Sequence, residues 1–443
     1  MKKITNDKSV QILSGFSITL LLVLWTATVP AQNDRYVNIT QYDVYEGLAG
    51  NKVTQMGQDD TGYMWFGTHS GLTRFDSQSL KNYQQDTLAS NALPANEISL
   101  FHLVGNEMWI SLNDVGLARF DTDKELFSMV QEKPGSNEGI EHSVVFALSS
   151  DEQNNVWIFQ FDHGISVYEK DRNSYTHYTP ENASWLTSVR FFDAKKAPNG
   201  NIWVATLEGQ ILEIDPKLRT AKTHEIEYDA GVLKSSRMYG ISVSSEGHIY
   251  ASGYQGVYQF NALTHQFERI ISDQNIIDLM GERLTVRSLL SDSQGQLWLA
   301  TRGALLLFQN NQLNQIRFLQ KGKPVMIDLN VRMVFEDKEK NIWLATDENG
   351  SLKLNHGWND FNIYLPFLET SLANNKINEI LSDHGNLEDT FWVANEAANN
   401  LLVYRYQKGR FIQSQVYDEK NNLPEVILSM YQDSDFRLWV TST

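Results

Sequence analysis

The chain has 443 residues, of which 42% are hydrophobic and 11% aromatic, so it can bury a large core and is not a disordered protein. It contains no cysteine, which excludes disulfide scaffolds, cysteine-ligated zinc, iron–sulfur clusters and cysteine nucleophiles. A formal net charge of −17 argues against nucleic acid as a partner and fits a ligand that is neutral or non-anionic.

The first 31 residues have the pattern of a signal peptide. A short basic region with three lysines precedes an uncharged stretch at residues 12–29, and Val29 and Ala31 occupy the −3 and −1 positions of a cleavage site. Because 18 uncharged residues are just long enough to span a bilayer, an uncleaved membrane anchor is the alternative. We predict a signal peptide over residues 1–31 and a periplasmic location for the exported part of the chain.

One sequence motif recurs along the rest of the chain. Its clearest copy, residues 51–76, combines an alternating apolar run, an Asp-x-x-Gly turn, an apolar segment around a tryptophan, and a Gly-apolar-x-x-aromatic-Asp segment. The aromatic position returns every 44–49 residues and so defines nine units. The markers of these units are Trp65, Trp109, Trp157, Trp203, Tyr250, Trp298, Trp343, Trp392 and Trp439.

Each unit has the pattern of four short β-strands. In the sixth unit, residues 286–290, 297–301 and 305–308 are apolar runs of strand length separated by glycine-containing turns. Aromatic residues indicate a fourth strand, as at 175–178 of the third unit. Four strands in about 47 residues are typical of a β-propeller, in which blades stack around an axis and bury both faces of each sheet. We therefore predict an all-β propeller and interpret each marker as an aromatic wedge between neighbouring blades.

The motif resembles the two-component regulator propeller repeat. Residues 65–76 match that repeat almost position for position, and residues 342–346 match it with Asp337 before them and Gly350 after them. The resemblance extends from Tyr36 to the end of the chain. It implies a periplasmic, ligand-sensing region whose ligands are small molecules, often oligosaccharides. It also implies a full-length receptor with two tandem seven-bladed propellers, an anchor in the inner membrane, a cytoplasmic output module, and dimerisation through its C-terminal parts.

The units suggest one complete ring and the start of a second. We expect residues 32–357 to form a seven-bladed sensor propeller and residues 358–443 to form two blades of an incomplete second propeller. Because the last unit stops inside a strand, we interpret the chain as truncated and lacking its output domain. A single closed ring of eight or nine blades is the alternative. For a seven-fold ring, residues 36–42 have the spacing of an outer strand that pairs with the seventh unit, residues 331–354.

Candidate ligand-binding residues lie in the loops after the marker strands, which share one face of a propeller. These loops differ from unit to unit, as expected where each blade supplies a different group to an irregular ligand. An ordinary solvated rim is the alternative for any one of them. The candidates are His69, Asn113, Asp114, Phe161, Asp162, Glu208, Tyr254, Arg302, Asp347 and Asn349.

The Asp-x-x-Gly turns belong to the opposite face. We interpret their aspartates as caps of their own turn backbone rather than as ligand or metal sites. The ten histidines show no recurring metal-ligand spacing, so we predict no metal site, and nothing in the sequence indicates a cofactor or a catalytic residue.

Three functions remain open at this level: a non-catalytic sensor, a propeller glycoside hydrolase or lyase related to sialidases, and a protein-interaction platform. Residues 291–298 are close to the Ser-x-Asp-x-Gly-x-Thr-Trp turn of sialidases, which are propeller enzymes. Such an enzyme would also need convergent arginines, for which Arg190, Arg237, Arg287 and Arg332 are the candidates. Fold alone does not support an activity, so we favour the sensor.

Overall fold

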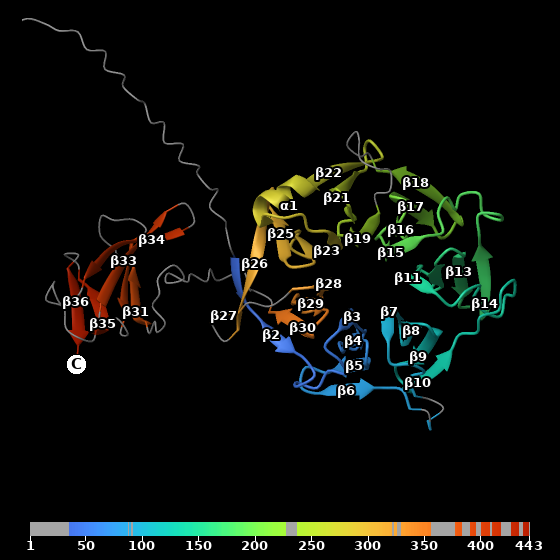
Figure 1. The fold of residues 1–443 in the computed structure, drawn as a ribbon, viewed down its shortest axis with the longest axis horizontal. Helices are drawn as coiled ribbons and strands as arrows, with labels where there is room; N and C mark the ends of the chain where they lie inside the picture. The colour runs from blue at the N-terminus through green and yellow to red at the C-terminus, as the bar shows by residue number, and fades with distance from the viewer. Residues whose placement is uncertain are drawn as a thin grey trace, which may run out of the picture. The chain divides into compact units, whose positions relative to one another are not determined.

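The computed structural model describes residues 35–86, 88–89, 92–226, 237–320, 323–325 and 329–355, and beyond them 377–382, 390–395, 400–407, 410–417, 427–433 and 437–442. The predicted signal peptide lies outside the described residues. Within 35–355, seven β-sheets are arranged as a ring around a central axis (Figure 1).

Each blade runs outward from the axis in chain order. Blade 1 consists of β3 (Val53–Gln58), β4 (Met64–Thr68), β5 (Gly71–Phe75) and β6 (Leu80–Tyr83). Blade 2 consists of β7 (Ile98–Val104), β8 (Glu107–Leu112), β9 (Gly116–Asp121) and β10 (Leu126–Met129). Blade 3 consists of β11 (Val145–Ser150), β12 (Val156–Gln160), β13 (Gly164–Glu169) and β14 (Ser174–Tyr178). Blade 4 consists of β15 (Phe191–Lys196), β16 (Ile202–Thr206), β17 (Gln210–Asp215) and β18 (Thr220–Glu225).

The remaining blades carry the additions to this pattern. Blade 5 consists of β19 (Met238–Val243), β20 (Ile249–Gly253), β21 (Gly256–Asn261) and β22 (Gln266–Ser272), and α1 (Asp273–Met280) follows it. Blade 6 consists of β23 (Val286–Ser291), β24 (Leu297–Thr301), β25 (Leu305–Gln309) and β26 (Gln312–Gln320), with β1 (Arg35–Asn38) and β27 (Lys323–Val325) on β26. Blade 7 consists of β28 (Val331–Glu336), β29 (Ile342–Thr346), β30 (Ser351–Leu354) and β2 (Thr40–Tyr42).

The N-terminal segment closes the ring across two blades rather than one. β2 supplies the outer strand of blade 7 by pairing antiparallel with β30, where the sequence placed a strand. β1, however, pairs in parallel with β26 of blade 6, so the expectation that all of residues 36–42 pair with the seventh unit is wrong for its first part. The reason is that β26, with nine residues, is longer than β25 and leaves an outer edge to which β1 can bond.

The marker tryptophans lie at the contacts between consecutive blades. Trp65 packs in one cluster with Ile98 and Phe101 of blade 2, and Trp343 packs with Val53 and Met56 of blade 1. In the ring these tryptophans are at most 2% exposed, and Tyr250 is partly buried. Each blade is thus joined to the next by apolar burial, which is the main favourable term in folding.

The aspartate of the Asp-x-x-Gly turn stabilises both its own turn and the buried tryptophan. In blade 6, Asp292 Oδ1 accepts from the backbone N–H groups of Gln294 and Gln296, and Oδ2 accepts from Trp298 Nε1 at 2.8 Å. The same bond to the indole recurs in blades 1, 3 and 7 at 2.7–3.2 Å. Blades 2 and 4 lack this aspartate, and the indole nitrogens of Trp109 and Trp203 have no hydrogen-bond partner.

Glycine at the start of the third strand is required by geometry. Gly164 has a φ of 102°, and a Cβ atom there would lie 2.2 Å from the carbonyl oxygen of Tyr178 in the neighbouring strand. A side chain is therefore excluded by backbone conformation and by space, which explains the glycine in the Gly-apolar segment of the motif.

The C-terminal strands repeat the blade pattern. β31 (Ile377–Ser382), β32 (Thr390–Asn395), β33 (Asn400–Gln407) and β34 (Arg410–Tyr417) form a four-stranded antiparallel sheet, and β35 (Ile427–Gln432) pairs with β36 (Leu438–Ser442). Ala394 and Leu401 of the first sheet pack with Ile427 and Met430 of the second. The fold class is confirmed: a seven-bladed ring is followed by part of a second propeller.

The last marker differs from those in the ring. Trp439 is 57% exposed, although its indole donates to Asp433 at 2.8 Å as in the ring blades. The burial of the marker thus depends on a neighbouring sheet, whereas its bond to the turn aspartate is formed within one hairpin.

Candidate functional site

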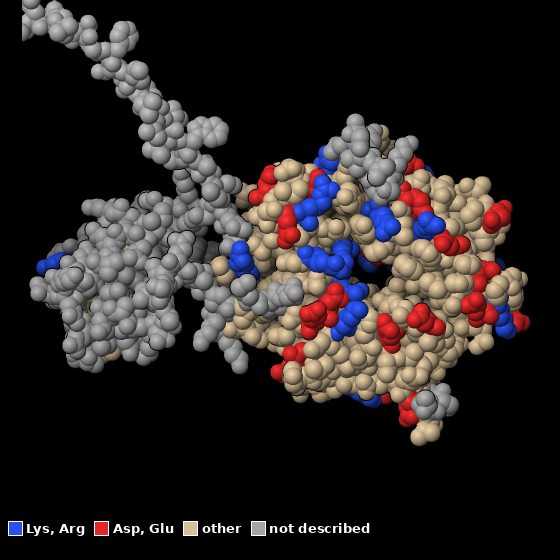
Figure 2. Space-filling view, in the orientation of Figure 1, with Lys and Arg blue, Asp and Glu red and all other residues tan. Residues whose placement is uncertain are grey.

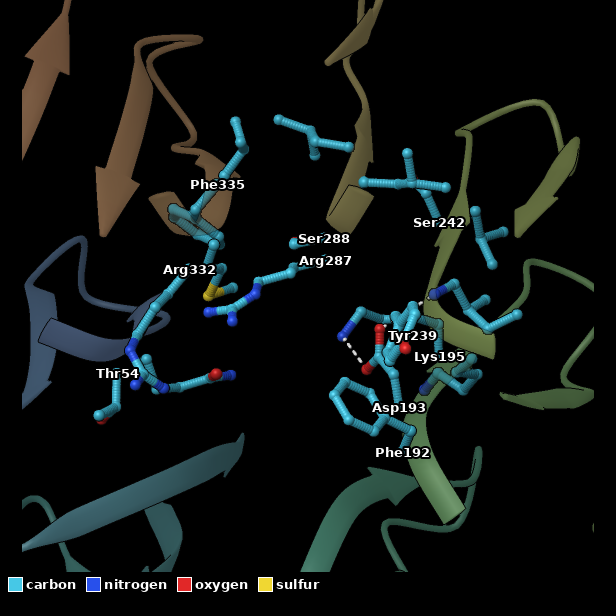
Figure 3. A pocket seen from close by; sticks show the side chains of 18 residues that line it. Thr54, Phe192, Asp193, Lys195, Tyr239, Ser242, Arg287, Ser288, Arg332 and Phe335 are labelled. Carbon is cyan, nitrogen blue, oxygen red and sulfur yellow. Dashed lines mark hydrogen bonds and ion pairs between the residues drawn. The ribbon is translucent and has the colours of Figure 1, made fainter. Parts of the chain in front are cut away.

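The centre of the ring is a channel lined by the innermost strands. Its cavity of about 300 Å³ is bordered by residues of β3, β15, β19, β23 and β28, which belong to blades 1, 4, 5, 6 and 7. Figure 3 shows side chains from these strands facing one another across the channel. This is the place where separate blades can contact one ligand at the same time.

Every innermost strand carries a β-bulge at its second residue. In blade 1 the register passes from the pair Val53 and Thr68 to the pair Gln55 and Gly67, so that Thr54 is the extra residue. A bulge leaves one residue outside the regular ladder and re-aims its side chain, and bulges are common beside functional sites. The bulge residues of blades 1 to 7 are Thr54, Ser99, Phe146, Phe192, Tyr239, Arg287 and Arg332.

The bulges lie on the same face as the candidate loops. Thr68, which pairs with the first residue of β3, is the last residue of β4 and directly precedes His69. The same relation holds in each blade because the innermost strand begins beside the end of the marker strand. We call the channel opening on this face, surrounded by the seven bulge residues, the mouth.

Blades 6 and 7 make one side of the mouth basic. Arg332 Nε donates to Asp347 Oδ1, which joins a bulge residue to a residue of the candidate loops. Partial burial lowers the pKa of Arg287, and the neighbouring charges of Arg302 and Arg332 lower it further. The guanidinium of Arg287 is therefore close enough to those of Arg302 and Arg332 to be repelled by both, and Asp347 offsets this in part. Figure 2 shows Lys and Arg side chains gathered at the central opening, over β23 and β28.

Blades 3 to 5 make the other side of the mouth aromatic. Phe192 and Tyr239 meet edge to face with ring centroids 5.4 Å apart, and Phe146 stacks on the candidate Phe161 at 4.8 Å. All four rings are only partly buried. In Figure 3, Phe192 and Tyr239 lie across the channel from Arg287 and Arg332. The mouth thus presents flat apolar faces opposite cationic hydrogen-bond donors.

Other candidates gather in two polar groups. Between blades 3 and 4, Arg190 contacts Asp162 at 2.8 Å and Glu208 at 3.9 Å, and Glu208 also accepts from Ser188 Oγ. Between blades 1 and 2, His69 Nδ1 lies 2.9 Å from a carboxylate oxygen of Glu97.

The position of His69 links it to the basic side. Its pKa is lowered, first by burial and then by Lys52, while Glu97 opposes the shift. Arg332 and Asp347 of blade 7 also influence this pKa, so the imidazole is close to the basic side of the mouth.

The remaining candidates have local roles or stand apart. Asn113 and Asp114 are exposed, and Asp114 and Asp162 adopt positive φ values of 57° and 58°, a turn conformation that aspartate tolerates. The ring of Tyr254, 45% exposed, stacks under the guanidinium of Arg283 at 5.2 Å. The backbone N–H of Asn349 donates to Thr346 Oγ1, which shapes its own turn.

The sequence predicted candidate residues in the loops, but it did not identify most of the bulge residues that surround the mouth. Of the seven bulge residues, only Arg287 and Arg332 were considered, and only as part of the enzyme alternative. A signal existed: each bulge residue stands eleven residues before the marker of its blade, or ten in blade 2. This position changes from hydroxyl to aromatic to arginine around the ring, while the apolar residue before it is always buried.

The arginine cluster that an enzyme would need forms only in part. Arg287 and Arg332 converge with Arg302, whereas Arg190 is paired with Asp162. A sialidase-type site would also use a tyrosine beside a carboxylate. In the described part of the chain, the Tyr239 hydroxyl makes no hydrogen bond to a carboxylate. The mouth therefore combines aromatic rings on one side with a group of arginines on the other.

A partly buried histidine of blade 2 is expected to make stability dependent on pH. His102 Nε2 lies 3.0 Å from Ser150 Oγ, and burial lowers the pKa of His102 to about 4, with Lys195 and Lys196 contributing. Because an unfolded histidine titrates near pH 6.5, the unfolded chain binds a proton here between about pH 6.5 and 4 that the folded chain does not bind. We expect the free energy of unfolding to fall as pH falls through this window.

Urea unfolding at pH 7.5 and pH 5 measures this effect. The variant His102→Gln keeps a donor for Ser150 and removes the titration, so its stability should fall less between the two values. An equal loss in both proteins would show that other groups cause the dependence.

No group of three or more His, Asp or Glu side chains arranged as a metal site is found among the described residues. Within that same part of the chain, the helices are too short or too polar to cross a bilayer.

Comparison with known proteins supports the repeat and the fold. Residues 47–70 match the model of the family described as two component regulator propeller. The extracellular domain of the hybrid two-component system BT3049 from B. thetaiotaomicron is 21% identical, with a TM-score of 0.69 over 91% of this chain and 52% of that one. The corresponding domain of BT4673 from the same organism is 16% identical, with a TM-score of 0.59 over 91% and 51%.

Similarity also reaches enzymes with a propeller fold. Virginiamycin B lyase from Staphylococcus aureus is 12% identical, with a TM-score of 0.54 over 72% of this chain and 99% of the lyase. No curated protein sequence matches this chain.

The chain spans about half the length of the two extracellular domains that it resembles, and at these identities the likeness concerns the fold. The repeat that the sequence suggested is confirmed by the family match within blade 1 and by the seven repeated sheets. The ring of this chain is a seven-bladed propeller, and residues 47–70 match the two-component regulator propeller repeat.

Proposed function

We propose that this chain is the ligand-binding region of an exported sensor and that the mouth of its ring binds an oligosaccharide without catalysis. The observation that carries the proposal is the ring of seven bulge residues, which differ in chemistry although the backbone around them repeats. A purely structural position in a repeat protein would have no need of such variety.

The aromatic side of the mouth favours a sugar. Phe146, Phe192 and Tyr239 offer ring faces on which the apolar face of a pyranose can stack, and the polar groups of the loops can bond its hydroxyls. The volume of about 300 Å³ is at the lower end of the range for small-molecule sites, so the mouth would hold a few sugar units and leave the rest of a chain in solvent.

The wider setting of the sensor is also a proposal. The structures similar to this chain include extracellular domains of hybrid two-component systems, and the repeat is that of two-component regulators. We place the ring on the periplasmic side of an anchored receptor that signals through a separate output module and dimerises outside the ring.

A thermal-shift screen with a panel of oligosaccharides, followed by product analysis, tests the function. The sensor hypothesis predicts that at least one oligosaccharide raises the melting temperature and is recovered intact. Cleaved sugar would favour the lyase or hydrolase alternative. Absence of any shift, together with a protein that co-purifies, would favour the interaction platform.

Variants locate the binding. Phe192→Ala combined with Tyr239→Ala should abolish the ligand-induced shift, because both stacking faces are lost. Tyr63→Ala is the matched control, since Tyr63 lies in the turn between β3 and β4 on the opposite face. Equal binding by the double variant would refute the mouth as the site.

A further inference from the structure

The basic side of the mouth is unusual for so acidic a chain. The sequence has 54 Asp and Glu residues against 37 Lys and Arg, so carboxylates are available to pair with most arginines. Elsewhere in the ring, Arg74 contacts Glu125 at 3.2 Å and Arg219 contacts Glu169 at 3.0 Å. The mouth departs from this pattern.

Two of its three arginines have no carboxylate partner. Arg332 is neutralised by Asp347, but in the part of the chain that the structure describes neither Arg287 nor Arg302 forms an ion pair. Arg287 is only partly exposed and lies close to the like charges of Arg302 and Arg332, which the carboxylate of Asp347 offsets only in part. A guanidinium that is partly removed from water and lies close to two like charges is unfavourable in the free protein.

We infer that Arg287 and Arg302 form the binding site for an acidic group, a carboxylate or a sulfate, carried by the oligosaccharide that the mouth receives. This inference rests on the proposed function and narrows its ligand to acidic oligosaccharides. A guanidinium offers parallel N–H donors that fit two oxygens of a carboxylate or sulfate, and the anion relieves the repulsion between the arginines.

The geometry allows the sugar ring and the acidic substituent of one ligand to be bound at the same time. The sugar ring would stack on Phe192 and Tyr239, and its acidic substituent would point across the channel to Arg287 (Figure 3). Arg332, whose charge is paired with Asp347, lies beside the site. The net charge of the whole chain suggested a neutral or non-anionic ligand, but one side of the mouth carries a group of arginines.

Titration calorimetry of the whole chain tests the inference with three probes: an oligogalacturonate, its carboxyl-reduced neutral counterpart, and a sulfated oligosaccharide of similar length. We expect the oligogalacturonate or the sulfated probe to bind at least about tenfold more tightly than the neutral sugar. The preferred probe identifies the acidic group.

Variants connect the preference to the two arginines. Arg287→Met should weaken binding of the acidic probe by about 10- to 100-fold and leave binding of the neutral sugar nearly unchanged. Arg302→Met, at an exposed position, should act in the same direction without risk to folding. Arg172→Met is the control, because it removes an equal charge from an exposed turn between β13 and β14 on the opposite face.

The outcomes separate the two proposals. Equal affinity for the acidic and neutral sugars, or unchanged binding of the acidic probe by both arginine variants, would overturn the inference and leave the oligosaccharide sensor standing. Binding of no sugar of any kind would overturn both.

Discussion

Replacing Trp298 by alanine is expected to lower the free energy of unfolding by about 3–5 kcal/mol. The side chain is fully buried between blades 6 and 7, in a cluster that includes Val331 and Leu344. The substitution would leave a cavity at the contact between blades and would also remove the donor that satisfies the buried Asp292. Urea unfolding followed by circular dichroism measures the loss, and a midpoint within error of the unsubstituted chain would refute the role of the tryptophan.

A pair of conservative variants separates packing from hydrogen bonding. Trp298→Phe keeps an aromatic ring but leaves the Asp292 carboxylate without its indole donor, whereas Trp109→Phe breaks no such bond because the Trp109 nitrogen has no partner. We expect Trp298→Phe to cost about 1–3 kcal/mol more than Trp109→Phe. Equal costs would show that the bond to the turn aspartate contributes little.

Placing a charge on β1 is expected to detach this strand from blade 6. Val37 of β1 is 1% exposed and packs in the core of blades 6 and 7, so Val37→Asp must either bury an unpaired carboxylate or detach the strand. We expect a loss of about 3–5 kcal/mol in the free energy of unfolding, since buried unpaired charges are among the most destabilising substitutions.

Thr40→Asp is the matched control for Val37→Asp. It adds the same charge three residues later, at an exposed position of β2, and should change stability by less than about 1 kcal/mol. Similar losses in the two variants would mean that charge in the N-terminal segment, rather than burial of the charge at Val37, sets the effect.

The fold was predictable because its information is local and repeated. The spacing of Trp65, Trp109 and the later markers sets the blade length, and glycine turns divide each unit into strands. The parallel pairing of β1 with β26 was not predictable, because it joins segments about 280 residues apart along the chain and depends on the excess length of β26. Nothing in the local sequence of residues 35–38 distinguishes blade 6 from blade 7 as the partner.

The site was predictable only in outline. Loop position and chemical variety placed His69, Asp347 and the other candidates on one face, and the structure brings these two close to Arg332. The bulge that turns Arg287 toward the channel arises from the pairing of two strands. It therefore cannot be predicted from the sequence of one strand. The arginines of separate blades come together only when the ring closes, so their proximity could not be predicted from the sequence.

Hydrogen–deuterium exchange of the whole chain, with and without a bound oligosaccharide, tests most directly whether the mouth is the ligand site. We predict slower exchange at the starts of β15, β19, β23 and β28 and in the loops after the marker strands, with no change in the Asp-x-x-Gly turns of the opposite face. Protection confined to those turns or to the outer strands of the blades would contradict the account.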